Sequence, residues 1–305
     1  MKRPLPGLPI RSPNLREIDV SDDWLDVVEG RLQNLHNEVQ KRDSQSRKTL
    51  DEVFDESTLL ILYKLISNGL LETIDYPVST GKEANVFHAT ARGGGSLAVK
   101  IFRVNTATFR SFMTYIHGDP RFQSVRQQRR DIVYAWTQKE YKNLQRMQQA
   151  EVRVPNALAY HSNVLVMDFI GDQGTPAPLV KDRPPSDPRA AYEDVCENYR
   201  RMYRGASLVH GDLSEFNILN LNEELFIIDV AQSVLTRHPM RDELLTRDAK
   251  NLTRWFRKLG VKTTPEETLA AMKGPDPVAD EEPEDEDFED EDYEDEDDEG
   301  EEEEQ

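Results

Sequence analysis

The chain has 305 residues, with 58 acidic and 38 basic side chains and a net charge of −20. Twenty-two of the acidic residues lie in 276–304, which contains no Lys or Arg, so residues 1–275 carry a net charge of only +2. This distribution excludes a salt-adapted protein with an acidic surface throughout, and it excludes a uniformly basic nucleic-acid-binding protein. The body is long enough to bury a substantial core.

The cysteine content and the hydropathy of the chain narrow the class of protein further. The single thiol, Cys196, excludes an intramolecular disulfide, and we expect it to be reduced and partly buried in a helix. No run approaches the roughly 18 apolar residues that a membrane-spanning helix needs. The start, MKRPLPGLPIRSP, lacks the apolar segment of a signal peptide. We therefore expect a soluble, cytoplasmic protein with no membrane contact.

The periodicity of apolar residues predicts the elements in chain order. Residues 1–50 are expected to form an extension, irregular to residue 20 and helical over 21–42. A second helix is expected over 55–70, with Gly69 at its end. Two short strands, 84–90 and 97–102, are joined by a glycine-rich turn. The polar stretch 103–128 predicts a long connection without regular structure.

The second half of the body is predicted to be mainly helical. A loop-and-strand unit, 208–229, interrupts the helices. The other expected elements are a helix over 129–150, strands over 157–161 and 164–169, a Gly/Pro-rich segment over 171–188, and helices over 190–203, 242–259 and 265–273.

A carboxylate and an amine stand where apolar residues are expected. Glu140 falls on the same helical face as Ile132, Trp136 and Leu144, and a buried carboxylate is costly unless it is paired. Alternation in the strand 97–102 puts Lys100 on the face opposite Val99. A strand lysine paired with a helix glutamate is the arrangement that holds nucleotide phosphates in protein kinases.

Two further carboxylates lie in the loop-and-strand unit. In HGDLSEFN, Asp212 and Asn217 have the spacing of the kinase catalytic loop. There the Asp orients the attacking hydroxyl and the Asn binds Mg²⁺. The apolar run LFII ends abruptly in Asp229, which predicts a carboxylate ligand for a hard cation. Taken singly, Asp212 or Asp229 is more often a turn or cap residue, but the full set in this order is specific.

The phosphate-binding loop is expected just before the lysine strand. Ser79, Thr80, Gly81 and Lys82 occupy this place. The sequence is neither a Walker A motif, because Glu83 follows Lys82, nor a kinase GxGxxG. Backbone N–H groups, the two hydroxyls and Lys82 could still meet anionic oxygens.

The motifs together resemble the first subfamily of the RIO family of atypical serine/threonine protein kinases. The resemblance is carried by STGKEANV, AVKIF, WTQKEYKNL, VLVMDFIG, HGDLSEFNIL and IIDVAQSV, and it runs from about residue 51 to residue 273. It implies an α+β, minimal bilobal kinase-like fold with a β-rich N-lobe and a mainly helical C-lobe. The corresponding boundaries are a kinase domain over 51–275, an N-lobe to about 168, a hinge over 168–172, a C-lobe over 173–275 and a disordered acidic tail over 276–305.

The same resemblance implies roles for individual residues. Lys100 would bind ATP phosphates and pair with Glu140, Asp212 would be the catalytic acid/base, and Asn217 and Asp229 would hold Mg²⁺, with Mn²⁺ as an alternative. Asp229 would also form an aspartyl-phosphate intermediate in ATP hydrolysis. The adenine would contact the backbone of the hinge at Asp168 and Ile170. It would also contact three apolar side chains, those of Met167, Val86 and Ala98.

Some parts of an ordinary kinase are missing, which makes a broad protein-substrate repertoire doubtful. Asp229 is followed by Val230 and Ala231 in place of Phe-Gly, and no APE motif follows. The resemblance implies a role in maturing the small ribosomal subunit, with pre-ribosomal RNA, ribosomal proteins and assembly factors as partners of a monomer. Three interpretations stay open: an active kinase/ATPase, a nucleotide-gated assembly factor, and a degenerate scaffold, which the filled catalytic positions disfavour.

The charged segments outside these motifs have two interpretations each. The tail 276–305 is too acidic to bury a core. It is a solubilising segment, or else a ligand for basic surfaces or a competitor for RNA-binding sites within the chain. The basic clusters RQQRR at 126–130 and Arg200, Arg201 and Arg204 are solvated faces or RNA contacts.

Overall fold

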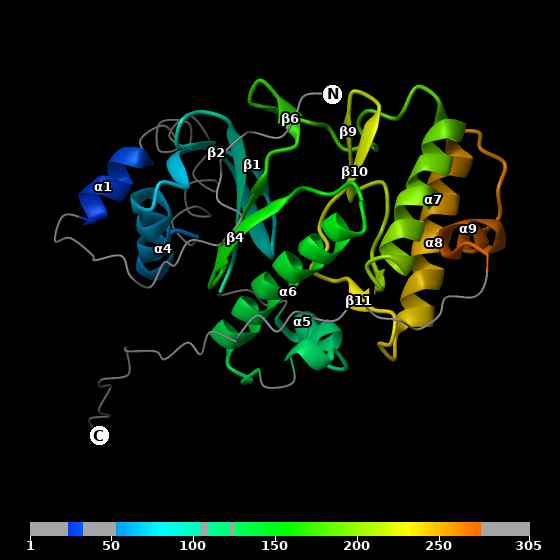
Figure 1. Cartoon of the computed structure of the whole chain (residues 1–305), viewed down its shortest axis with the longest axis horizontal. Helices are drawn as coiled ribbons and strands as arrows, with labels where there is room; N and C mark the ends of the chain where they lie inside the picture. Colours follow the sequence, from blue (N-terminus) through cyan, green and yellow to red (C-terminus); the bar gives the residue numbers. More distant parts are fainter. Residues whose placement is uncertain (1–23, 33–52, 105–108, 123–124, 276–305) are drawn as a thin grey trace.

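The computed structural model describes residues 24–32, 53–104, 109–122 and 125–275. Its N-terminal half contains a five-stranded antiparallel sheet with the strand order β1-β2-β3-β5-β4. The strands are β1 (Leu71–Thr80), β2 (Ala84–Ala91), β3 (Ser96–Phe102), β4 (Ala157–His161) and β5 (Val164–Asp168). Helices α1 (Trp24–Arg31) and α4 (Glu56–Ser67) lie on one side of this sheet (Figure 1).

Helix α6 (Arg129–Gln149) runs beside the sheet toward the C-terminal half (Figure 1). It is preceded by α5 (Phe109–Ile116) and a short 3-10 helix, Pro120–Phe122. The aromatic rings of Phe112 and Trp136 stack with centroids 4.3 Å apart, which fastens α5 to α6. The prediction of a connection without regular structure over 103–128 is therefore wrong in part, because burial of apolar side chains against α6 stabilises two short helical segments there.

The C-terminal half packs three helices beside a small β unit (Figure 1). The helices are α7 (Pro188–Arg204), α8 (Arg241–Lys258) and α9 (Pro265–Lys273). The β unit consists of short antiparallel pairs, which are β9 (Ile218–Leu221) with β10 (Glu224–Ile227) and β8 (Leu208–Val209) with β11 (Val234–Leu235). A third pair, β6 (Gly171–Asp172) with β7 (Thr175–Pro176), follows β5 in the chain. None of the helices in the described ranges is long and apolar enough to span a lipid bilayer.

Local sequence sets the starts of several helices. The Asp55 carboxylate caps α4 by accepting a hydrogen bond of 2.8 Å from the backbone N–H of Thr58. Asp187 caps α7 in the same way. Thr264 and Glu267 form a reciprocal capping box at α9. These caps satisfy N–H groups that the first helical turn leaves without partners.

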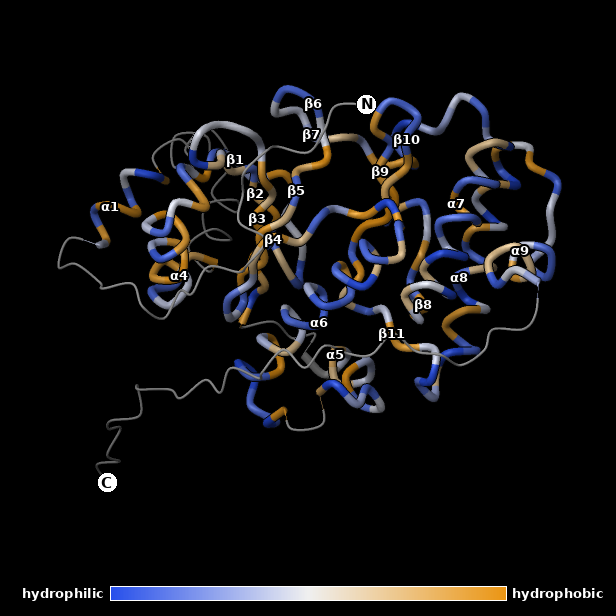
Figure 2. The backbone as a smooth tube through the Cα atoms, in the orientation of Figure 1, coloured by the Kyte–Doolittle hydropathy of each residue, from blue (hydrophilic) through white to orange (hydrophobic). Residues whose placement is uncertain are grey.

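The pairing register separates an apolar face of the sheet from the face that forms the site. Phe87, Val99 and Val166 pair across β2, β3 and β5 and are buried in the core beneath α4. Figure 2 shows this sheet as largely hydrophobic, whereas α7 and α8 alternate between hydrophobic and hydrophilic residues. Because side chains alternate along a strand, Ala98 and Lys100 emerge on the opposite face.

The structure confirms an α+β, bilobal kinase-like fold with a β-rich N-lobe and a helical C-lobe. Strand β1 and the short strands β6, β7 and β11 are additional to the predicted elements. Because β1 ends at Thr80, Ser79 and Thr80 end a strand and do not lie in a loop. Helix α1 covers part of the helix expected over 21–42, while residues 33–42 lie outside the described residues, as does the tail. Cys196 is buried in α7 as expected.

Candidate functional site

A buried lysine connects two carboxylates where the sheet meets α6. The Nζ of Lys100 lies 2.8 and 2.7 Å from the two carboxylate oxygens of Glu140 and 2.9 Å from Oδ1 of Asp229. Glu140 is 2% exposed and also accepts a hydrogen bond from the backbone N–H of Val230. The structure thus contains the lysine–glutamate pair that the sequence predicts, and it adds Asp229 as a third member.

The electrostatics of this group favour the charged forms of Lys100 and Asp229, whereas burial raises the pKa of Glu140. Burial alone would lower the pKa of Lys100, but the charges of Asp229 and Glu140 outweigh burial and hold the pKa above its ordinary value. The positive charge of Lys100 lowers the pKa of Asp229. The Asp229 side chain is 43% exposed and its backbone has φ 61°, so an ionised carboxylate faces the solvent side from a strained position.

The β9–β10 hairpin brings Asn217 beside Asp229. The backbone N–H of Ile228 donates to the carbonyl of Asn217 at 3.0 Å, directly ahead of the strand pairing between Ile218 and Ile227. The Asn217 Nδ2 donates to the carbonyl of Asp212 at 2.9 Å. This contact uses the amide nitrogen, so the amide oxygen of Asn217 is the atom left for a ligand. The short hairpin therefore positions a carboxylate and an amide oxygen together.

Hydrogen bonds of a neutral histidine hold the loop that carries Asp212. The His210 ring is fully buried, and burial lowers its pKa to about 4, so the ring is neutral at pH 7. Its Nε2 lies 3.1 Å from the carbonyl of Ile228, and its Nδ1 lies 3.3 Å from the backbone nitrogen of Asp212. A neutral ring with the proton on Nε2 satisfies both contacts. His210 thereby links the Asp212 loop to the strand that ends at Asp229.

Helix α8 supplies two residues that the sequence patterns did not single out. The carboxylate of Asp248 is fully buried and accepts hydrogen bonds of 2.8 Å from the backbone N–H groups of both Gly211 and Leu213. The guanidinium of Arg247 donates to the carbonyl of Gly211. Burial raises the pKa of Asp212, and the charge of Arg247 opposes this shift. A raised pKa suits a carboxylate that accepts a proton during reaction.

A second buried lysine, next to Glu140, fixes the turn that follows Asp229. Lys139 is fully buried and its Nζ donates to the carbonyls of Ala231, at 3.1 Å, and of Ser233. Asn143, one turn later on α6, donates to Val230 at 2.9 Å and to Ser233 at 3.1 Å. Burial lowers the pKa of Lys139 to about 7. Helix α6 therefore contributes Glu140 to the site and also holds the 230–233 turn that follows Asp229.

The residues expected around adenine lie on one face of the sheet and on the segment that follows β5. Val86 pairs with Lys100, and Ala98 pairs with Met167, so these side chains project to the same side. The backbone N–H of Asp168 already donates to the carbonyl of Asn156 at 2.9 Å, and the carbonyl of Ile170 accepts from Ala177 at 3.0 Å. The hinge groups that are available to an adenine base are therefore one acceptor, the carbonyl of Asp168, and one donor, the N–H of Ile170.

The expected phosphate-binding segment forms the tight turn between β1 and β2. The N–H of Gly81 donates to the carbonyl of Ala84 at 3.0 Å, and a Cβ at Gly81 would lie 2.9 Å from that oxygen, so no side chain fits. Glu83 follows in the turn, and burial together with the charges of Asp229 and Asp212 raises its pKa. Glu83 thus approaches both site carboxylates, a proximity that the sequence patterns did not indicate.

The ligands present fit a magnesium ion bound together with a nucleotide. The described residues contain no cluster of three or more His, Cys, Asp or Glu arranged for a metal, so a complete protein cage is absent there. Asp229 and Asn217 offer oxygen ligands only. Mg²⁺ prefers one or two such ligands, with water and phosphate oxygens completing its shell.

Comparison with known proteins agrees with this geometry. The family model of the RIO domain matches residues 85–269. The RIO-type serine/threonine-protein kinase Rio1 of Haloferax volcanii is 42% identical over 246 residues, which cover 80% of this chain and 84% of that protein. Rio1 of Methanocaldococcus jannaschii is 41% identical over 221 residues, covering 72% and 76%. Human serine/threonine-protein kinase RIO1 is 37% identical over 253 residues, which are 81% of this chain but 44% of that protein.

Solved structures give the same fold. The Rio2 kinase of Chaetomium thermophilum, crystallised as an ADP/Mg²⁺-phosphoaspartate complex, aligns with a TM-score of 0.55 and 20% identity, covering 87% of this chain and 88% of that chain. At this identity the likeness concerns the fold alone. The family model and the Rio1 relatives decide the assignment, and this protein belongs to the RIO family of atypical serine/threonine kinases.

Proposed function

We propose that this protein transfers the γ-phosphoryl group of ATP, with Mg²⁺, to a serine or threonine hydroxyl or to water, and that it does so in the maturation of the small ribosomal subunit. The observation that carries the chemistry is the contact of Lys100 with both Glu140 and Asp229, beside the loop that carries Asp212 and Asn217. The ribosomal role is supported by the family resemblance of the motifs.

The residues divide the work of transfer. Lys100, oriented by Glu140, binds the α/β-phosphates of ATP. The acceptor oxygen attacks the γ-phosphorus, the bond from this phosphorus to the β,γ-bridging oxygen breaks, and ADP leaves. The Asp212 carboxylate accepts the proton that the hydroxyl loses. Bound Mg²⁺ would be held by Asn217 and Asp229 and would neutralise charge on the phosphates.

A second route is favoured by the geometry of Asp229. Its carboxylate is ionised, partly exposed and lies on the turn clamped by α6. Attack of this carboxylate on the γ-phosphorus would give an aspartyl phosphate and ADP, and water would then release phosphate. The Rio2 kinase of Chaetomium thermophilum was crystallised as a phosphoaspartate complex. In this reading, hydrolysis at Asp229 drives release of a nucleotide-gated assembly factor.

A turnover assay with γ-labelled ATP distinguishes the routes. Free phosphate and labelled protein are measured separately, with and without purified immature small ribosomal subunits. Label that resists hydroxylamine in a ribosomal protein supports transfer to a hydroxyl, and label in the enzyme that hydroxylamine removes supports Asp229. Absence of both label and phosphate release, with or without subunits, contradicts the proposed function.

The gated-release reading has its own test in cell extracts. Asp212→Ala should trap the ATP-bound state, because release would need hydrolysis. The tagged variant should then sediment with immature small subunits in a larger fraction than the tagged parent. Equal retention of the two proteins contradicts gated release and leaves transfer to protein hydroxyls as the favoured activity.

A further inference from the structure

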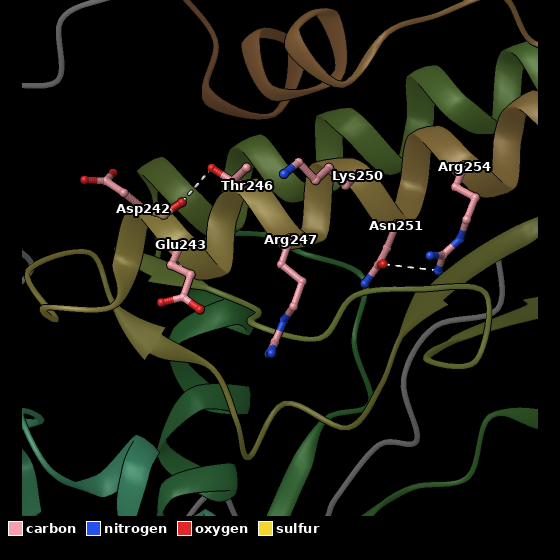
Figure 3. A pocket seen from close by; sticks show the side chains of 7 residues that line it. All are labelled: Asp242, Glu243, Thr246, Arg247, Lys250, Asn251 and Arg254. Carbon is pink, nitrogen blue, oxygen red and sulfur yellow. Dashed lines mark hydrogen bonds between the residues drawn. The ribbon is translucent and has the colours of Figure 1, made fainter.

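One face of α8 carries a row of basic residues beside the catalytic loop. Arg247, Lys250 and Arg254, which we call the α8 ridge, line a shallow hollow of about 600 Å³ together with Asp242, Glu243, Thr246 and Asn251. Figure 3 shows Arg247, Asn251 and Arg254 leaving the same side of the helix. Residues spaced by three, four and seven positions lie near one another on a helix surface, so the three cations of the ridge cluster along α8, with Asp242 and Glu243 at the N-terminal end of the hollow.

The outer part of the ridge has no anionic partner in the described part of the chain. Lys250 and Arg254 are exposed and form no ion pair there, and Arg254 donates only to the amide oxygen of Asn251, at 3.1 Å. Two other cations of α8 have acidic partners: Arg241 pairs with Asp242, and Lys258 approaches Glu215. The ridge therefore presents charge that is available to an acidic ligand.

The inner end of the ridge contacts the loop that carries Asp212. Arg247 donates to the carbonyl of Gly211, and its charge opposes the rise of the Asp212 pKa. A polypeptide that presents a hydroxyl to Asp212 would therefore lie close to Arg247. From Arg247 to Arg254 the helix rises by about 10 Å, the length of roughly three extended residues. The ridge is placed to select acidic residues near the acceptor hydroxyl.

The chain supplies an acidic segment that starts near the same helix. Arg204 donates to the carbonyl of Lys273 at 2.7 Å and to that of Pro275, and Arg200 donates to that of Ala271 at 3.2 Å. This part of the predicted basic cluster thus caps α9. The charge of Lys273 contributes to lowering the pKa of Asp242, so the end of α9 lies near the start of α8. Residues 276–305, at about 3.3 Å per extended residue, are long enough to reach the whole ridge.

The composition of this segment suits an inhibitor better than a substrate. Residues 276–304 contain 22 carboxylates and no Lys or Arg, and residues 276–305 contain no Ser or Thr. We propose that residues 276–304 bind the α8 ridge as a pseudosubstrate, occupying the acceptor side of Asp212 until an acidic protein acceptor displaces them. This proposal rests on the proposed kinase function, and it assigns acidic sequences around Ser or Thr as the substrate class.

Attachment in the same chain strengthens the contact between residues 276–304 and the α8 ridge. Single exposed ion pairs contribute little, but attachment in the same chain gives an effective concentration of roughly millimolar. Screening by salt weakens interactions among exposed charges. Inhibition by the tail should therefore be marked at low ionic strength and lost at about 0.5 M salt.

Carbodiimide cross-linking of the full-length protein tests binding without requiring turnover. Trypsin cleavage after Lys273 releases a peptide that ends at Gln305, and we expect this peptide joined to Lys250 in the monomer fraction. Lys250→Arg keeps the charge and should abolish that cross-link. Cross-links confined to dimers, or equal yields at Lys250 and at Lys64 on α4, would overturn the proposal even if phosphoryl transfer is normal.

Activity provides the second readout. Replacing every Asp and Glu of 276–304 by Asn and Gln should raise phosphorylation of a serine peptide without acidic residues by roughly tenfold at low salt. The variant Lys250→Glu with Arg254→Glu should have the same effect, whereas Lys250→Arg and the control pair Lys64→Glu with Arg189→Glu should behave as the parent. Unchanged phosphorylation in both the neutral-tail and ridge variants contradicts autoinhibition. Absence of phosphorylation in every protein, with the Lys250 cross-link present, contradicts the kinase function instead.

Discussion

The two halves of the site are held by different interactions. On the sheet side, oppositely charged side chains form ion pairs: Lys100 lies between Glu140 and Asp229. On the loop side, side chains hold backbone groups around Asp212: the neutral His210 ring contacts the N–H of Asp212, the Asp248 carboxylate accepts from the N–H of Gly211, and the Arg247 guanidinium donates to the carbonyl of Gly211. In the proposed function, the sheet side binds the nucleotide and is therefore sensitive to loss of charge, whereas the loop side positions the group that takes part in transfer.

Removing the central charge should have the largest effect. Lys100→Met leaves Glu140 buried without its cation, and breaking such a pair costs about 3–5 kcal/mol. It also removes the anchor of the ATP phosphates, so we expect turnover to fall below detection and the unfolding midpoint in urea to fall. Lys64→Met on α4 is the matched control. Turnover near the parental rate would remove Lys100 from the site.

The loop side should affect rate more than binding. Asp212→Ala removes the proton acceptor and should lower turnover by roughly 10²–10⁴-fold, the usual contribution of a positioned acid or base. The fold should persist because the Asp212 side chain is not fully buried. Steady-state phosphate release is the measurement, with Asp172→Ala on the β6–β7 hairpin as control. A loss smaller than tenfold contradicts the assignment.

The clamp behind Asp229 should give an intermediate effect. Lys139→Met keeps the volume of the side chain but leaves the Ala231 carbonyl without its donor, so the 230–233 turn is expected to loosen. We predict a roughly tenfold rise in the Mg²⁺ concentration for half-maximal turnover and a loss of about 1–3 kcal/mol of stability, because the buried Ala231 carbonyl is left without a hydrogen bond. An unchanged Mg²⁺ requirement would show that the clamp has no part in metal binding.

The smallest effect concerns pH. The folded pKa of His210, about 4, lies below its ordinary value of 6.5, so the unfolded chain binds more protons between these values. Stability should therefore fall as pH falls through this window, by roughly 2 kcal/mol from pH 7 to pH 5. His210→Gln should remove this contribution, and His117→Gln should not. Equal pH slopes of the unfolding free energy in the parent and His210→Gln would mean that the ring is not buried as a neutral group.

Local patterns explain why part of the site could be predicted from the sequence. Lys100 interrupts an apolar strand, Glu140 interrupts an apolar helical face, and Asp212 and Asn217 have a fixed spacing in one loop. The side chains that position them were not predictable in this way. Lys139 and Asp248 are satisfied by backbone groups far along the chain, and only the folded arrangement shows that these charges are buried.

The missed strand has a similar explanation. In β1, three irregularities in pairing with β2 break the alternation of side chains, so the buried positions are Leu71, Ile74 and Pro77, at intervals of three. This pattern does not have the period of two by which strands are recognised. Helix α5 was missed because it is short and packs by tertiary contacts such as that of Phe112 with Trp136.

The proposal that one half of the site binds the nucleotide and the other acts in transfer is tested most directly by equilibrium binding of ATP with Mg²⁺. Binding is measured by calorimetry on the parent, Lys100→Met and Asp212→Ala. The account predicts that Asp212→Ala binds within about threefold of the parent, because its carboxylate faces the acceptor and contributes to the transition state. Lys100→Met should bind at least a hundredfold more weakly, as expected from the loss of a buried charge pair. Equal weakening in both variants, or unimpaired binding by Lys100→Met, would contradict the account.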